Sequence, residues 1–213
     1  MAKWSLWVLG ILFVLQNFGL NVTSIIAGLG IGGIAIALAA QNILSDLFSS
    51  FSIAFDKPFE PGDFIVVGET SGTVQRIGLK TTRIQSLEGE EIILPNAQLT
   101  DARVQNYGRM EQRRVRFALG VEYATPQEKL RRIPDLVRST VESANNTRFD
   151  RSHFKVFGDS ALEFENVYYV RSGDYAEYMD INQEVLLNLN EALNREGIMV
   201  AFPTRTVHVA KEE

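Results

Sequence analysis

A run of 42 residues without a charged side chain, from Trp4 to Ser45, constrains this chain more than any other feature of its sequence. A signal peptide has an apolar core of only about 7–15 residues, so this run is too long to be one. Of the 26 acidic and 21 basic residues in the chain, all but Lys3 and Asp46 lie from Asp56 onward. The sequence therefore predicts an apolar segment, residues 1–57, followed by a charged soluble part.

Two membrane-spanning helices account for the length of the apolar run. The first is predicted at Trp4–Leu20 and the second at Ser24–Gln41, each about 25–27 Å long against a hydrocarbon core of ~30 Å. Trp4 and Trp7 near one end are typical of the aromatic belt at a membrane interface. Asn21 lies in the short turn between the helices and is a suitable N-cap for the second.

The charges that flank the two predicted spans set the topology. Lys3 precedes the first span and the charged part of the chain follows the second, so both lie on the same side of the membrane. Cytoplasmic segments carry an excess of Lys and Arg, which makes that side the cytoplasm. We therefore expect a multi-pass protein of the cell membrane, such as a bacterial inner membrane, with a cytoplasmic soluble part.

A glycine-rich stretch in the second span, residues 28–33, satisfies the dinucleotide-binding pattern G-x-G-x-x-G letter for letter. That function requires a strand before the glycines and an acidic residue about 20 positions later. Here the preceding run has the length of a helix, and the nearest acids, Asp46 and Asp56, miss the spacing and the context. The stretch therefore favours a membrane helix over a nucleotide-dependent enzyme.

Small side chains gather on two sides of this second helix when it is plotted at about 100° per residue. One side carries Gly30, Gly33 and Ala37, and the other carries Ala35 and Ala39. Because small residues let membrane helices approach closely, two unlike sides favour a head-to-tail contact between copies that closes into a ring. The seam between the two sides consists of Ala27, Ile34 and Leu38 and would face the ring axis.

Ile34 and Leu38 are about one helical turn apart and, repeated around an axis, would form two stacked apolar collars. A narrow apolar constriction stops ions by dewetting. A compact bundle, in which the glycines serve only packing, fits the wheel equally well.

After Leu38 the pattern becomes amphipathic over 42–55, which suits a helix that lies along the membrane surface or caps a soluble domain. Gln41 and Asn42 are the predicted place of a kink between the two parts.

The next segment, residues 58–106, has the pattern of a small all-β domain. Pro58 and Pro61 end the preceding helix, and Gly62 permits a turn. Four short strand-like runs separated by glycines follow, at Phe64–Val67, Thr73–Ile77, Lys80–Gln85 and Glu91–Leu94. This spacing predicts a small, strongly bent β-barrel or sandwich.

Four motifs succeed one another in this segment: a PF-x-x-GD turn from Pro58, a G-T-V strand, a T-T-R-I strand and an I-x-L-P-N loop from Ile92 to Asn96. They follow the helix GLGIGGIAIALAAQNILSDL. In this order they make the chain resemble the core of the small-conductance mechanosensitive channel (MscS) family, from about Ile25 to Gln105. The rest of the chain fits that family more loosely.

The resemblance implies a homoheptamer with a gated pore, a small Sm-like β-barrel domain and a hollow cytoplasmic vestibule. It implies gate rings at Ile34 and Leu38 and packing glycines at Gly30 and Gly33, with Ala37 where the family can have glycine. Together with the small residues of the helical wheel, the predicted packing set is Ala27, Gly30, Gly33, Ala35 and Ala37. The family often has a glycine directly after the glutamine of the kink, where this chain has Asn42. Members normally carry at least one further membrane helix before these two, so we expect a fragment or an unusually short member.

The last part, residues 107–202, reads strand–helix–strand–strand–helix–strand, which predicts a ferredoxin-like α+β domain. The strands are expected near Arg113–Val121, Phe154–Val156, Leu162–Val170 and Ile198–Ala201. The helices are expected at Pro126–Ala144, with Thr125 as N-cap, and at Tyr175–Arg195. The resemblance implies that the end of the chain, 203–213 with its alternating run Thr204–Val209, joins copies into a barrel on the symmetry axis.

Composition excludes several function classes. The chain has no cysteine, two histidines without ligand-like spacing, and no catalytic constellation, so we expect no enzyme, no metal and no cofactor. Its net charge of −5 disfavours a nucleic-acid partner. Two basic clusters, at 113–116 and 131–132, would either attract anions in a vestibule or be surface charges balanced by nearby acids.

These features together predict a homo-oligomeric ring in which an α-helical membrane pore is followed by the two soluble domains. We expect a mechanosensitive ion channel that membrane tension opens, releasing ions and small osmolytes on hypo-osmotic shock. Its expected partners are copies of itself, membrane lipids and permeating solutes. The alternative is a membrane-anchored small β-barrel that binds nucleic acid, which would need a basic, aromatic face.

Overall fold

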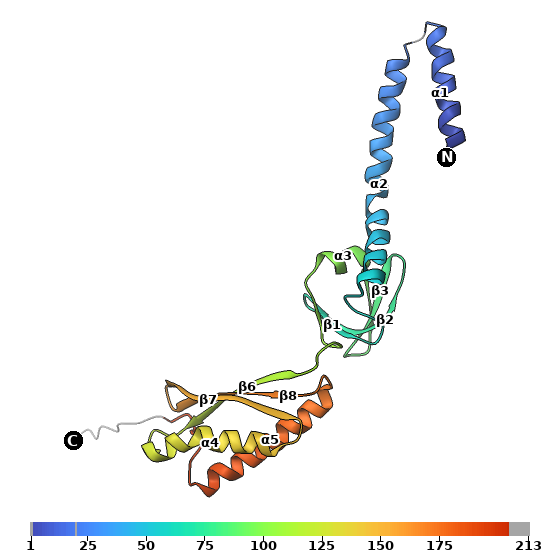
Figure 1. Cartoon of the computed structure of the whole chain (residues 1–213). Helices are drawn as coiled ribbons and strands as arrows, with labels where there is room; N and C mark the ends of the chain where they lie inside the picture. Colours follow the sequence, from blue (N-terminus) through green and yellow to red (C-terminus); the bar gives the residue numbers. More distant parts are fainter. Residues whose placement is uncertain (1, 20, 205–213) are drawn as a thin grey trace, which may run out of the picture. The chain divides into compact units, whose positions relative to one another are not determined.

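The computed structural model describes residues 2–19 and 21–204 of the chain. It divides into two compact units, Met1–Asn106 and Tyr107–Glu213, which are described separately (Figure 1). The first unit holds two helices and a small β domain, and the second holds an α+β domain. This is the architecture that the sequence predicts.

The first unit begins with two consecutive helices, α1 (Ala2–Asn17) and α2 (Val22–Asp56). Asn21 caps α2 as predicted, because its side-chain oxygen accepts a hydrogen bond of 3.0 Å from the Thr23 amide. The helix ends where Lys57 adopts a left-handed conformation and its amide donates to the Ile53 carbonyl. Pro58 follows and cannot continue the helical hydrogen bonding.

The β domain of this unit is one antiparallel sheet in the order β4-β3-β2-β1-β5. Its elements are β1 (Phe64–Val67), β2 (Thr70–Ile77), β3 (Thr81–Ser86), β4 (Glu91–Pro95), α3 (Asn96–Asp101) and β5 (Val104–Asn106). The first four strands lie at the predicted runs: β1 agrees in both bounds, β2 begins three residues earlier, β3 is shifted by one residue and β4 ends one residue later. The I-x-L-P-N segment is not the loop that the sequence predicted, since it forms most of β4 and the first residue of α3.

Two of the sequence motifs have clear structural reasons. In the PF-x-x-GD turn, the Asp63 carboxylate accepts hydrogen bonds from the Glu60 amide (2.9 Å) and the Asn106 side chain (2.8 Å), which joins the turn to β5. In the G-T-V strand, a side chain at Gly72 would overlap the Gln85 carbonyl of β3. Both motifs therefore fix the tight packing of the small sheet.

The second unit is a three-stranded antiparallel sheet with two helices on one face (Figure 1). Its elements are β6 (Arg113–Val121), α4 (Gln127–Ser143), β7 (Thr147–Phe157), β8 (Leu162–Val170) and α5 (Tyr175–Arg195), and the strand order is β6-β8-β7. One apolar core lies between sheet and helices and includes Val121, Val137, Phe164, Val185 and Leu193.

The predicted fourth strand, Ile198–Ala201, is reduced to one bridge between Val200 and Val121. The Glu122 and Ala201 amides add flanking backbone hydrogen bonds, to the Met199 and Gly120 carbonyls. The segment therefore follows the free edge of β6, where a ferredoxin-like fold has its last strand. Pro203 has no amide proton, and this limits the pairing.

Two further predictions in this unit are wrong in detail. Thr125 does not cap α4: its amide closes a turn on the Glu122 carbonyl, and Pro126 is the N-cap without a side-chain hydrogen bond. Strand β7 begins seven residues earlier than predicted, because irregularities at Phe149/Arg151 and Phe154/Val156 interrupt its alternation. The predicted inter-subunit strand lies outside the described residues from position 205 onward.

Candidate functional site: the second helix and its attachment

The membrane-facing candidate is the first part of α2, whose apolar side chains nothing else in the described chain covers. An 18-residue window of this helix has a mean hydropathy of 2.1, and none of it is buried. Among the described residues α2 is the one helix long and apolar enough to span a membrane, while the apolar stretch of α1, Leu6–Asn17, is shorter. A soluble monomer rarely exposes an apolar surface of this extent. Lipid or further protein must therefore cover α2.

The candidate gate residues lie on this uncovered surface. Ile34 is 63% exposed and Leu38 is 66% exposed, so α1 covers neither of them. The other members of the predicted packing set, Ala27, Gly30, Gly33, Ala35 and Ala37, are also exposed. The structure thus places all seven residues on one continuous helix, and their roles as gate and packing residues remain predictions.

Two glycines of α2 border space that the described residues do not fill. A Cβ atom built on Gly30 or Gly33 would have no heavy atom within 4 Å outside its own stretch of helix. Packing among the described residues therefore gives no reason for a glycine at either position. An interior glycine costs a helix about 1 kcal/mol relative to alanine, so the glycines need a reason outside this chain.

Helical hydrogen bonding runs through Gln41 and Asn42, where the sequence predicted a kink. From Ile34 to Asp56 the helix contains neither glycine nor proline, the residues that most often cause sharp kinks. The structure has one continuous α-helix across both residues, and Gln41 and Asn42 remain predicted positions for a kink.

The second part of α2 is anchored in the β domain. Ile53 is 1% exposed and belongs to the same apolar core as Phe59, Ile65 and Leu99. For residues 42–55 the sequence predicted either a helix along the membrane surface or a helix that caps a soluble domain. This contact agrees with the second alternative. Because the core surrounds Ile53, a movement of this end of α2 must move the β domain or break the contact.

Polar groups of α2 also bond to the short helix α3. Asp46 is 4% exposed, and its carboxylate accepts a hydrogen bond of 3.1 Å from the Ala97 amide. One turn further on, the Ser49 and Thr100 hydroxyls are 2.8 Å apart. The sequence pattern does not reveal either contact, since the two partners in each lie 51 residues apart along the chain.

Asn96 connects these contacts to the sheet. It is completely buried, and its side chain accepts from the Thr82 hydroxyl (2.9 Å) and donates to the Gly78 carbonyl (2.8 Å). The Ser50 hydroxyl of α2 donates to the same Gly78 carbonyl at 3.2 Å. The asparagine of the I-x-L-P-N motif thus joins α3, the β2–β3 connection and α2.

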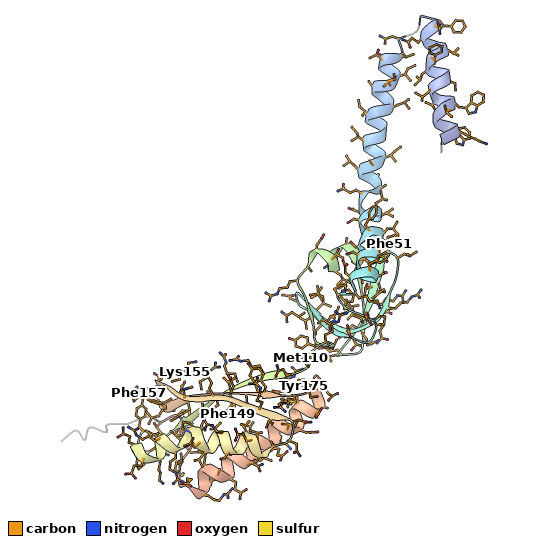
Figure 2. All side chains as sticks on the ribbon, viewed as in Figure 1. Phe51, Met110, Phe149, Lys155, Phe157 and Tyr175 are labelled. Atoms are coloured by element: carbon orange, nitrogen blue, oxygen red, sulfur yellow. The ribbon has the colours of Figure 1, made fainter. Side chains whose placement is uncertain are left out.

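The opposite side of α2 is apolar and exposed. Phe48, Phe51 and Phe55 recur at helical spacing with Leu44, and Figure 2 labels Phe51 on this side. An amphipathic helix of a soluble protein buries its aromatic side, whereas this helix buries Asp46 and Ser49 beside Ile53 and leaves its phenylalanines uncovered. This reversed arrangement indicates that lipid or another chain covers the phenylalanines.

The basic clusters of the soluble part differ in their surroundings. The Arg113 guanidinium lies over the rings of Tyr107, Tyr175 and Tyr178, at 5.8, 5.5 and 5.0 Å from the ring centroids. In the second cluster, Arg132 forms an ion pair of 2.6 Å with Glu196. In the part of the chain that the structure describes, no three His, Asp or Glu side chains gather into a group that could hold a metal ion.

Comparison with known protein families agrees with this architecture over almost the whole chain. Residues 3–41 match "Mechanosensitive ion channel, transmembrane helices 2/3", and residues 42–109 match "Mechanosensitive ion channel, beta-domain". Residues 115–200 match "Mechanosensitive ion channel MscS, C-terminal". The chain belongs to the MscS family. The resemblance inferred from its sequence motifs is thereby confirmed.

Two similar MscS-type proteins come from Methanocaldococcus jannaschii. The large-conductance mechanosensitive channel MscMJLR is 36% identical over 218 residues, covering 100% of this chain and 60% of the relative. The small-conductance channel MscMJ is 36% identical over 206 residues, covering 96% of this chain and 59% of the relative. This chain thus spans about three fifths of the length of these relatives.

A solved structure, that of MSL1 from Arabidopsis thaliana, shares the fold. It superposes with a TM-score of 0.78 at 23% sequence identity, covering 95% of this chain and 74% of that one. The fold class predicted from the sequence, a membrane helix segment followed by a small β domain and an α+β domain, is thereby confirmed.

Proposed function

We propose that this chain is the pore-lining and cytoplasmic part of a mechanosensitive ion channel in the cell membrane. Membrane tension opens it, and it releases ions and small osmolytes on hypo-osmotic shock. One observation carries the proposal: none of the residues that the structure describes covers the long apolar surface of α2. Membership of the MscS family, and the relatives named as mechanosensitive channels, support the same function.

Copies of α2 surround the pore in this proposal. The unfilled space at Gly30 and Gly33 lets a neighbouring helix approach closely, and Ala35 offers a small surface on the other side. Such head-to-tail contacts close into a ring, for which the resemblance implies seven copies. Ile34 and Leu38 then face the axis as two apolar collars, which exclude water and ions while they are narrow.

Tension acts on the difference in membrane area between the closed and open rings. It shifts the population toward the wider state in the same way that a ligand shifts a population toward the state it prefers. A change from 1% to 99% open requires about 5.5 kcal/mol of work in favour of the open state. The collars become wet when the helices tilt and separate.

The soluble part is cytoplasmic in this proposal, with α1 and α2 as two spans and Lys3 on the same side as the β domain. The contacts of Asp46, Ser49 and Ile53 hold that domain against the end of the pore helix. No finding above favours the nucleic-acid-binding alternative, and the net charge of −5 counts against it.

The test is to reconstitute the chain in liposomes and record currents from excised patches under graded suction. We expect a tension-activated current, and we expect Leu38→Ser to open at lower tension because a hydroxyl eases wetting of the collar. Ile36→Ser is the matched control, since Ile36 lies on the opposite side of α2. A Leu38→Ser channel with the wild-type threshold and the wild-type closed-state leak would contradict the gate assignment.

A further inference from the structure

A groove of about 410 Å³ opens in the second unit between the first half of α4 and one end of β7 and β8. Its walls are mostly apolar and are formed by Leu130, Pro134, Phe154, Phe157, Leu162 and Phe164. Gln127 and Arg131 of α4 also line it, whereas no carboxylate of the described residues does. Apolar walls with a few polar groups, in a volume of about 300–1,000 Å³, are typical of sites for small ligands.

Two phenylalanines of β7 form one wall of this groove. Phe154 pairs across the strands with Phe164, and Phe157 pairs with Leu162. Both partners are buried in the core between sheet and helices, and cross-strand neighbours lie on the same face of a sheet. Phe154 and Phe157 therefore belong to the core face, yet they are 41% and 69% exposed (Figure 2 labels Phe157). The apolar face of the sheet thus extends beyond the part that the described residues cover.

The two rings make the wall continuous with the core. The centroids of the Phe154 and Phe157 rings are 4.9 Å apart in an edge-to-face arrangement, and Phe154 also contacts the buried Phe164 ring at 5.3 Å. On its other side, Phe157 stacks on Tyr123 at 6.5 Å. Because these neighbours hold the rings in place, the wall is already formed before any ligand binds.

The basic cluster at 131–132 supplies the charge of the groove. Arg131 is exposed, lines the groove and forms no ion pair with any residue that the structure describes. The next residue, Arg132, does not line the groove, and its guanidinium lies 2.6 Å from the Glu196 carboxylate. One arginine of the cluster is thus balanced by an acid, while the other stands beside an apolar wall and can pair with an anion.

We infer that this groove binds a monovalent anion with an apolar chain, of the class of medium-chain fatty acids. The apolar walls take the chain, and the planar guanidinium of Arg131 pairs with the carboxylate. A single cation matches one negative charge better than the charge of nearly two on a phosphate monoester. Each methylene that leaves water strengthens binding by up to about fourfold. The inference goes beyond the proposed channel function and does not depend on it, since the whole groove belongs to the second unit.

The experiment labels the full-length protein in lipid nanodiscs with decanoate that carries a photoreactive diazirine at the far end of its chain. Mass spectrometry of proteolytic peptides then locates the label. We expect labelling of groove residues in β7 and α4, such as Phe157 and Leu130, in addition to labelling of α2 from the bilayer. Unlabelled decanoate should prevent the labelling of the groove at about fifteenfold lower free concentration than octanoate, because its chain is two methylenes longer.

Two variants separate the charge from the apolar wall. Arg131→Gln should weaken competition by decanoate at least about tenfold, because it removes hydrogen bonds to a charged group. The matched control, Arg132→Gln, removes the same charge one residue away and should leave the competition unchanged. The uncharged 1-decanol should compete equally in both variants and in the wild type. Phe157→Ala, at an exposed position, should weaken competition by decanoate and by 1-decanol alike.

Three results would overturn the inference. Labelling of α2 without labelling of the groove would show that the reagent reaches the protein and that lipid or another copy of the chain excludes it from the groove. Equal competition in Arg131→Gln and Arg132→Gln would show that Arg131 does not bind the carboxylate. Octanoate as potent as decanoate would show that the groove does not bury the chain. None of these results bears on the proposed channel function, which the patch recordings test separately.

Discussion

Replacement of Ile53 by alanine tests whether the end of α2 is anchored in the β domain. Ile53 is 1% exposed and packs in one core with residues of β1, β2 and β3, among them Ile65, Val74 and Ile84. Truncation of a fully buried isoleucine to alanine costs about 2–5 kcal/mol, because both the transfer energy of the lost carbons and the cavity count. The free energy needed to open the β domain should therefore fall by that amount.

Hydrogen exchange of the intact protein in lipid, read by mass spectrometry, measures this loss. Each 1.36 kcal/mol corresponds to about a tenfold change, so the slowest amides of β2, such as Val74, should exchange at least about thirtyfold faster in Ile53→Ala. The control is Ser52→Ala, one residue earlier on the exposed side of α2, which removes only an exposed hydrogen bond to Asp56. It should change the opening free energy by no more than about 0.5 kcal/mol. Equal exchange of β2 in the two variants would refute the anchoring of α2 in this core.

Three further predictions concern packing and charge. Gly33→Val should raise the gating tension or prevent assembly, although a Cβ atom there has no neighbour within 4 Å among the described residues outside its own stretch of helix. A variant ring that gates at the wild-type tension would contradict contact between copies through Gly33. Gly72→Ala should destabilise the β domain by about 2 kcal/mol, because its methyl group overlaps the Gln85 carbonyl, and an unchanged melting temperature would exclude that overlap. The pKa of Glu177 lies below its usual 4.5 because Ser172 and Asn146 donate hydrogen bonds to its carboxylate. These hydrogen bonds stabilise the folded state fully above pH 4.5, and this stabilisation is lost as the pH falls through the lowered pKa of the folded state. Melting curves between about pH 5 and pH 3 should therefore depend less on pH in Glu177→Gln, and an unaltered dependence would show that these hydrogen bonds do not contribute.

The sequence determined the elements with a regular pattern and clear ends. The bounds of β1, β6, β8 and α5 agree with those predicted, because glycines and polar turn residues mark their ends. In β7 two irregularities break the alternation, so only its last residues were recognised. The three-residue strand β5 and the six-residue helix α3 are too short to show a period.

The candidate pore residues followed from helical periodicity, but the attachment of their helix did not. Asp46 and Ser49 have the composition of a solvated helix face, and only the fold brings them to Ala97 and Thr100. The exposure of Phe48 and Phe55 follows from the same contact, which buries the polar side of the helix. The β6–β8–β7 sheet likewise depends on strand order, since Arg116 and Arg151, distant in the sequence, lie on either side of Val167 in β8.

Thiol accessibility tests most directly whether Leu38 faces a pore. The chain contains no cysteine, so single cysteines at Leu38 and, on the opposite side of α2, at Ile36 can be compared without background. A water-soluble methanethiosulfonate reagent applied during tension-activated opening should block the current of Leu38→Cys and leave that of Ile36→Cys unchanged. Block of Ile36→Cys with no effect on Leu38→Cys would show that the proposed gate residue faces lipid.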